Sequence, residues 1–285
     1  MVRIGNVWDS TTDVLAGRTA TLAGVATLAF FVPAAAQVGL TAWGGASPAP
    51  GVAALGALVK LVALIASVWG SLTIIAVASD PAITRGQASA SATKRLPAAL
   101  LLMLVLIAVG IALVVPVVAM LAAGGFDFQA AMAQAGSATQ PRLPAGTNVF
   151  LFFYVLAILI GAAWACARLF PLLAVVLHEK RGIGAFGRSW TLTRGMTWRL
   201  IGVGILFVVV FLIASLAAQA VVVVVLRLVL GPALITVATL LGGLAAAVVG
   251  AIFSAVVAVF GARLYAALLA RDAVPIAAAP IPSAT

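Results

Sequence analysis

The chain has 285 residues, of which 65% are hydrophobic and 8% are charged, and its 16 Lys and Arg residues outnumber its 6 Asp and Glu residues to give a net charge of +10. A soluble domain carries about 25% charged residues, so this composition excludes one and predicts a polytopic membrane protein. Basic residues at helix ends beside anionic lipid explain the positive charge, and no nucleic-acid partner is expected. One cysteine and one histidine exclude an internal disulfide and argue against a protein-bound metal or haem.

The N-terminal segment 3–18 is predicted to be an amphipathic helix that lies in the membrane surface. Its apolar residues share one helical face, whereas Asp9 and Asp13 occupy the opposite face. The first predicted span follows at 19–43. Small residues after Pro33 resemble a signal-peptidase site, so a cleaved signal peptide is the alternative. The long, acidic and amphipathic start favours a retained span.

Further apolar runs complete a predicted bundle of six transmembrane helices, each long enough to cross about 30 Å of hydrocarbon. These runs are 52–79, 98–123, 148–177, 200–226 and 234–269. Two basic connections, 82–95 and 179–198, are predicted to lie along the inner membrane surface. Residues 1–271 should therefore form a single all-α membrane domain, and the Pro/Ala-rich segment 272–285 is expected to be a disordered tail.

The segment 179–198 carries most of the predicted lipid contacts. On a helical wheel, Phe186 and Trp190 fall opposite Arg181 and Arg188. The aromatic face is expected to enter the acyl boundary while the arginines meet anionic headgroups, and the segment is expected to run without a break into the fifth span. The predicted anionic-lipid contacts are Arg168, Arg181, Arg188, Arg194 and Arg199, and the predicted interfacial anchors are Trp8, Phe186, Trp190 and Trp198.

The distribution of basic residues predicts the orientation of the chain. If six spans place both ends on one side, most of the 16 basic residues lie on that side, and the other side holds only Arg142 and Arg227. Basic loops stay in the cytoplasm. The prediction is a multi-pass protein of the bacterial inner membrane with cytoplasmic N and C termini.

Two basic residues lie inside predicted spans, and their role is open from sequence. Lys60 and Arg168 could each line a cavity, or each could extend its side chain to the nearer interface. A continuous polar cavity lined by these residues, Ser215 or Gln219 would favour transport. A tightly packed centre would favour a scaffold.

The last predicted span carries small residues at every fourth position. The row comprises Gly242, Ala246, Gly250 and Ser254. Small residues let a neighbouring helix backbone approach closely in a membrane. The row is predicted to pack within the bundle, and contact with a second copy or a partner protein is the alternative.

The junction between the fourth and fifth spans resembles a known family. Arg168 to Pro171, Ser189-Trp190, Leu192 to Gly195 and Trp198 to Leu200 are similar to the signature of the glycerophosphoryl diester phosphodiesterase membrane domain family of bacterial six-span proteins. Residues 4–15 resemble the usual start of that family. The family is named for a soluble phosphodiesterase domain that some members carry, and that catalytic domain has no counterpart here. The resemblance therefore implies a membrane fold without the enzymatic activity.

The sequence contains no arrangement of residues that predicts catalysis. The six acidic residues are dispersed, and no two are placed as an acid/base or metal-binding pair. The predicted protein is therefore not an enzyme and has no cofactor, metal site or catalytic residue. Its expected function is that of an envelope-associated scaffold or accessory subunit that contacts anionic lipid, and translocation of a lipid or small solute is the alternative. Membrane lipids are the expected partners, and a homo-oligomer or larger membrane complex is left open.

Overall fold

The computed structural model describes residues 3–45, 49–126, 145–179, 182–231 and 234–277. All regular elements in these residues are helical, and six helices are long and apolar enough to cross a membrane. The predicted all-α class and the six spans are confirmed. The chain is a multi-pass membrane protein.

The described residues form a series of helices. In chain order they are α1 (Ile4–Gly17), α2 (Thr19–Ala26), the π-helical turn η1 (Thr27–Phe31), α3 (Val32–Gly44), α4 (Pro50–Ser79), α5 (Arg85–Ala123), α7 (Ala145–Leu169), α8 (Leu172–Glu179), α9 (Gly184–Leu192), α10 (Thr197–Leu230) and α11 (Ile235–Ala277). The first span consists of α2, η1 and α3. The helix therefore runs on past Pro33 to Gly44, as the retained-span interpretation requires.

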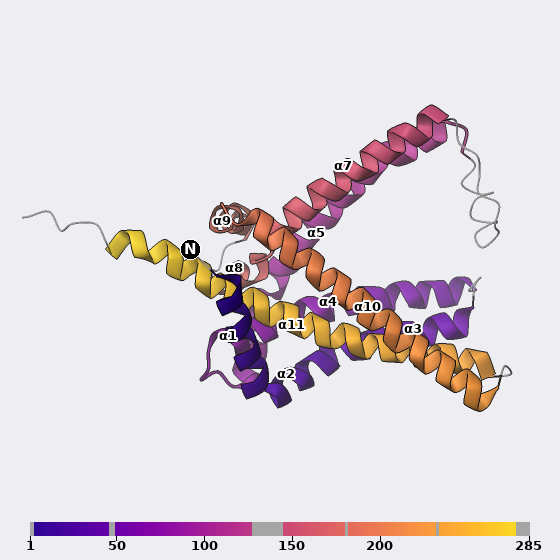
Figure 1. Cartoon of the computed structure of the whole chain (residues 1–285), viewed down its shortest axis with the longest axis horizontal. Coiled ribbons are helices and arrows are strands. Elements are labelled where there is room, and N and C mark those ends of the chain that lie inside the picture. Colours follow the sequence, from indigo (N-terminus) through magenta and orange to yellow (C-terminus); the bar gives the residue numbers. More distant parts are fainter. Residues whose placement is uncertain (1–2, 46–48, 127–144, 180–181, 232–233, 278–285) are drawn as a thin grey trace, which may run out of the picture.

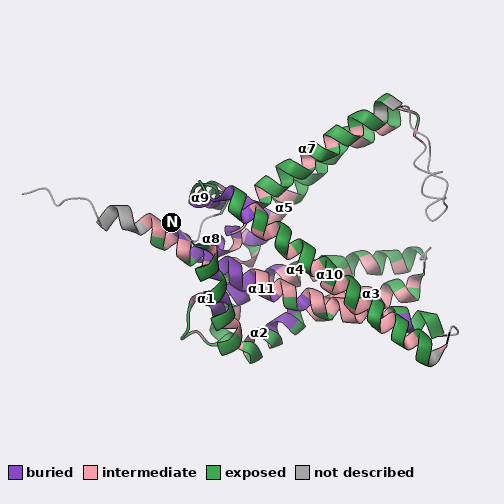
Figure 2. Ribbon diagram, in the orientation of Figure 1, coloured by how far each residue is buried: buried purple, intermediate pink, exposed green. Residues whose placement is uncertain are grey.

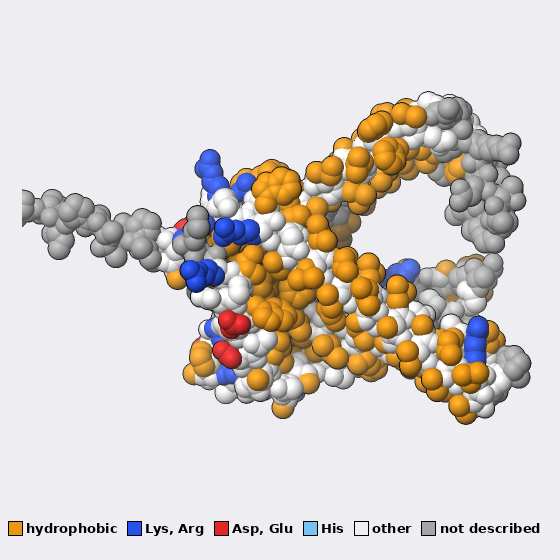
Figure 3. Space-filling view, in the orientation of Figure 1, with side chains coloured by type: hydrophobic (Ala, Val, Ile, Leu, Met, Phe, Trp, Pro, Cys, Tyr) orange, Lys and Arg blue, Asp and Glu red, His pale blue; other side chains and the backbone are white. Residues whose placement is uncertain are grey.

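The long helices form three pairs that diverge from one end of the molecule (Figure 1). The pairs are α3 with α4, α5 with α7, and α10 with α11. The α5–α7 pair points away from the other two, and open space separates it from them in Figure 3. Tyr154 of α7 donates a hydrogen bond of 3.0 Å to the carbonyl oxygen of Leu113 of α5 and links the two helices of this pair.

Buried residues are concentrated where the pairs meet (Figure 2). We call this region the convergent end; it consists of α1, α2, α8, α9, the C-terminal half of α4, the N-terminal half of α5 and the C-terminal part of α11. Leu72, Val175, Leu192 and Phe260 are fully buried there and come from four different helices. The apolar stretches of α5, α7 and α10 contain few or no buried residues. Side chains of this kind match the acyl chains around a membrane helix.

The predicted interfacial segment 82–95 is wrong as a separate element, because most of it is the start of α5. A capping box begins the helix: the Thr84 hydroxyl accepts a hydrogen bond from the Gln87 N–H at 3.3 Å, and the Gln87 side chain accepts one from the Thr84 N–H at 3.1 Å. Ala88 and Ala92 in the first turns are fully buried. Pro97 therefore lies inside a continuous helix instead of opening one.

One predicted span contains a helix break, and two further predicted boundaries are corrected by the structure. The span 148–177 corresponds to the apolar stretch Asn148–Glu179, but its helix is interrupted at Pro171, which lacks an N–H and whose ring would meet the carbonyl four residues earlier. The segment 179–198 does not run unbroken into α10, because Gly195 turns the chain with φ of 84°, a conformation that favours glycine. The tail does not begin at 272, because α11 continues to Ala277, and residues 278–285 lie outside the described part of the chain.

Glycines allow the closest approaches between helices. A β-carbon added at Gly70 of α4 would clash with the β-carbon of Ala29 in η1. At Gly242 of α11 it would lie 2.6 Å from a methyl carbon of Val223 in α10. The first residue of the predicted small-residue row therefore packs within the bundle.

We expect Gly70→Ala to lower the melting temperature of the detergent-solubilised protein. Overpacking at a fixed backbone contact costs about 1–3 kcal/mol, which exceeds the roughly 0.5–1 kcal/mol that Gly→Ala gains in a helix interior. Gly56→Ala is the matched control, because Gly56 is also in α4 and has no atom within 4 Å of an added β-carbon. Equal melting temperatures for the two variants would contradict the close contact.

Candidate functional site

Helix α7 ends just before Pro171, and residues in and next to α9 form hydrogen bonds with its C-terminal end. The last carbonyl groups of a helix have no partner within it. The buried hydroxyl of Ser189 donates a hydrogen bond of 2.9 Å to the carbonyl oxygen of Arg168, and the buried Thr193 hydroxyl lies 3.3 Å from the same oxygen. Residues of α9 thus complete the C-terminus of α7.

The side chain of Arg168 is enclosed by two tryptophans. Its guanidinium carbon lies 5.4 Å from the ring centre of Trp164 and 5.1 Å from that of Trp190, within the range of cation–π attraction. One terminal nitrogen donates to the carbonyl oxygen of Trp190 at 3.1 Å. Arg168 therefore holds α7 and α9 together, and Trp190 contributes to that contact.

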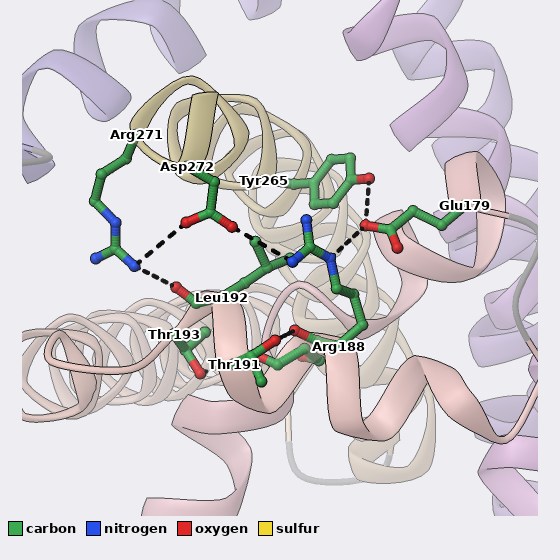
Figure 4. A network of polar contacts seen from close by, with 9 residues as sticks. Glu179, Arg188, Thr191, Leu192, Thr193, Tyr265, Arg271 and Asp272 are labelled. Atoms are coloured by element: carbon green, nitrogen blue, oxygen red, sulfur yellow. Dashed lines mark hydrogen bonds and ion pairs between the residues drawn. The ribbon is translucent and has the colours of Figure 1, made fainter. Parts of the chain in front are cut away.

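A network of charged groups joins α8, α9 and α11 (Figure 4). The Arg188 side chain donates to Glu179 at 3.0 Å and to Asp272 at 3.4 Å, and the Tyr265 hydroxyl donates to the same Glu179 oxygen at 3.2 Å. The hydrogen bond that Arg188 donates to Glu179 raises the pKa of Arg188, although partial burial opposes the shift. The charge of Arg188, predicted to meet lipid, is balanced within the protein.

Other arginines of the convergent end cap helix C-termini. Arg271 donates to the carbonyl oxygen of Leu192 at 3.1 Å, at the last residue of α9. Arg18 donates to the carbonyl oxygens of Val77 at 3.0 Å and Asp80 at 3.1 Å, at the end of α4. Cations are favoured at this position because the carbonyl end of a helix carries partial negative charge.

The connection between α9 and α10 presents exposed basic and aromatic side chains. Arg194 and Arg199 are exposed, and Trp198 between them is 82% exposed. Within the described residues neither arginine has an ion-pair partner. Lys and Arg side chains gather at this end of the molecule in Figure 3. We call Arg194, Trp198 and Arg199 the basic rim.

The other predicted surface residues have different surroundings. Phe186 packs against the buried core, and Trp8 lies 6.0 Å from Phe207 between ring centres while remaining 42% exposed. Arg181 lies outside the described residues. The lipid contacts and anchors assigned to these side chains stay predictions.

Sequence reasoning did not find the partners of the charged network. Arg188 and Asp272 are 84 residues apart, and Asp272 was assigned to a disordered tail. No periodicity connects residues at such a separation. The one signal of these ion pairs in the sequence is the excess of basic over acidic residues, because a partly buried acid is then expected to pair with an arginine.

A cavity that is open to the surroundings lies in the membrane-spanning part, lined by residues of η1, α3, α4, α10 and α11. Its volume is about 690 Å³, and Lys60, Gln37, Ser67 and Ser254 are polar residues in its lining. Arg168, Ser215 and Gln219, named from sequence as possible lining residues, are not among them. In the described part of the chain no group of three His, Cys, Asp or Glu residues could hold a metal ion.

Comparison with protein families identifies a relationship over nearly all of the bundle. The model of a domain of unknown function, DUF7847, matches residues 10–268. The chain belongs to the DUF7847 family. Comparisons with curated proteins and with solved structures find no match. The DUF7847 match begins within α1 and ends within α11, so most of the convergent end and nearly all of the six spans belong to one family domain. The resemblance to the phosphodiesterase membrane domain stays a prediction.

We expect Arg188→Ala to destabilise the protein by about 1–3 kcal/mol, because it removes hydrogen bonds to two carboxylates and leaves Glu179, 17% exposed, with less compensation. Arg194→Ala is the matched control, and its effect should stay within about 0.5 kcal/mol because the side chain is on the surface. Thermal unfolding in detergent measures both. Arg188→Ala should also increase protease cleavage between α8 and α9; equal stability of the two variants would contradict a role for the network.

Proposed function

We propose that this DUF7847 protein is a non-enzymatic membrane scaffold that contacts anionic lipid through its basic rim. The observation that carries the proposal is that some arginines of the convergent end bind groups of the protein itself, whereas others are exposed. Arg18, Arg188 and Arg271 are engaged by carbonyl or carboxylate groups of the protein. Arg194 and Arg199 are exposed beside Trp198.

A basic rim held in one conformation is expected to bind lipid with higher affinity than a flexible one. The capped and ion-paired helices below the rim hold α9, so less conformational freedom is lost when a headgroup binds. Each exposed basic side chain near an anionic leaflet contributes about 1 kcal/mol. An exposed tryptophan adds an anchor that prefers the headgroup level.

We further propose that the convergent end faces the cytoplasm at a bacterial inner membrane, because the basic residues gather there. The residues that resemble the phosphodiesterase membrane domain signature include Arg168, Ser189, Trp190 and Gly195. In this protein they form the α7–α9 contact and the turn before α10. We propose that the two families share this junction. Phosphodiesterase activity is not part of the proposal.

One observation favours the alternative of translocation. The cavity beside Lys60 is an opening in the membrane-spanning part, as a transporter requires. Its lining is mainly apolar, and Lys60 is the charged residue in it. A binding site for an amphiphile fits such a lining better than a path for a polar solute does.

We expect an Arg194→Gln/Arg199→Gln double variant to bind phosphatidylglycerol about 30-fold more weakly, since two contacts of about 1 kcal/mol are lost. Native mass spectrometry of the full chain in mild detergent, titrated with phosphatidylglycerol or phosphatidylcholine, measures the difference. Arg227→Gln is the control for loss of a basic residue elsewhere in the chain, because Arg227 lies in the last turn of α10. Equal affinities of the unaltered protein for the two lipids would refute the proposal, as would a double variant that binds like the control.

The proposed orientation is tested with reporter fusions at Ser137 and Ser283. Six spans place these residues on opposite sides of the membrane. A fusion at Ser283 should report the cytoplasm, and one at Ser137 should report the outer side. Two fusions on the same side would be incompatible with six spans, and the reverse pair would invert the orientation.

A further inference from the structure

The cavity within the membrane-spanning part exists because small residues from several helices face it. They are Ala29, Ala34, Ala63, Ala247, Gly250 and Ala251. A β-carbon added at Gly250 would have its nearest neighbour, in Phe211, at 3.9 Å, whereas one added at Gly242 would lie 2.6 Å from Val223. The same row of small residues on α11 therefore packs tightly at one end and leaves space at the other.

The wall of the cavity contains irregular helix geometry. The π-helical turn η1 supplies Ala29 and Phe30, and Pro33 follows one turn later. Widened turns of this kind are uncommon and occur frequently at functional sites, because they change the direction of side chains along one helix. Here the turn lies between α2 at the convergent end and α3, which lines the cavity.

A single cationic group faces this space. Lys60 lies ten residues, about 15 Å, along α4 from its start at Pro50. Within the described residues no carboxylate pairs with Lys60. An ammonium group inside a membrane is costly without a partner. The amide of Gln37 lines the same space and adds hydrogen-bond donors beside the charge.

Two smaller cavities share lining residues with this one, which we call the central cavity. A cavity of about 310 Å³ between α3 and α4 is also lined by Gln37 and Lys60. A cavity of about 530 Å³ between α1, α10 and α11 is also lined by Phe207 and Phe253, and its other lining residues are almost all apolar. Lys60 and Gln37 thus line both the central cavity and the cavity between α3 and α4, whereas Phe207 and Phe253 line both the central cavity and the mainly apolar one.

We propose that this space binds one anionic amphiphile. Its carboxylate or phosphate group pairs with Lys60 and accepts a hydrogen bond from Gln37, and its acyl chain lies along the central cavity toward Phe207 and Phe253. The volume of the central cavity alone, about 690 Å³, lies in the range of small-molecule sites. This site is separate from the basic rim, and the inference goes beyond the proposed scaffold function.

The test is photocrosslinking of the full chain in phosphatidylcholine nanodiscs. The anionic probes are palmitate and phosphatidylglycerol, each carrying a diazirine on the acyl chain. Hexadecanol with the same diazirine is the uncharged control. Crosslinked peptides are located by mass spectrometry. The expected result is labelling of α10 and α11 residues that line the central cavity by at least one anionic probe, well above labelling by the alcohol.

Two variants change the site by different means. Lys60→Met removes the charge and keeps a long side chain, and should reduce cavity labelling about ten-fold or more. Gly250→Leu adds a large side chain at a position where an added β-carbon has its nearest neighbour, in Phe211, at 3.9 Å, and should reduce labelling although Lys60 is retained. Lys60→Arg should preserve labelling. Arg227→Met is the matched control for loss of a basic residue elsewhere in the chain and should have no effect.

The source of the anionic group follows from the two probes. Labelling by palmitate alone identifies a fatty acid, and labelling by phosphatidylglycerol alone identifies a phospholipid; both support the site. Two results would overturn the site. One is cavity labelling by the alcohol that equals labelling by the anionic probes, and the other is cavity labelling that is unchanged in Lys60→Met. The Arg194→Gln/Arg199→Gln variant should keep cavity labelling, so failure of the rim and failure of this site are distinguishable.

Discussion

Carbonyl groups at the ends of interrupted helices need hydrogen-bond donors, and the convergent end is built from such donors. Ser189 supplies one for α7, Arg18 supplies two bonds for α4, and Arg271 supplies one for α9. In an apolar environment an unsatisfied carbonyl is expensive. The basic composition of the chain therefore supports the fold itself, before any contact with lipid is considered.

The six spans could be predicted because apolar runs of sufficient length identify transmembrane helices without any knowledge of tertiary contacts. The surroundings of the arginines could not. Arg18 meets carbonyl oxygens 59 and 62 residues away, and Arg188 meets an acid 84 residues away. A helical wheel places Arg188 opposite the aromatic face of one segment and carries no information about what another helix brings to it.

The same limit applies to the candidate ligand site. Sequence identified Lys60 as an unusual residue within a span, and identified the small residues of the last span as a packing row. Which part of that row touches a neighbour depends on how α11 diverges from α10 and α3, which periodicity does not determine. Gly242 meets Val223, and Gly250 borders open space. Equal spacing in sequence thus gives contact in one place and a cavity in another.

The involvement of α11 in the charged network has a consequence for biosynthesis. Tyr265 and Asp272 bind residues 86 and 84 positions earlier, and α1 also packs against α11. Contacts between the first and last helices cannot form until the last helix has left the ribosome and entered the membrane. Until then the earlier spans lie in the bilayer, and Glu179 and Arg188 lack the hydrogen-bond partners that α11 supplies. Completion of the convergent end is a late, whole-chain event, and a protein shortened before Tyr265 would leave it unfinished.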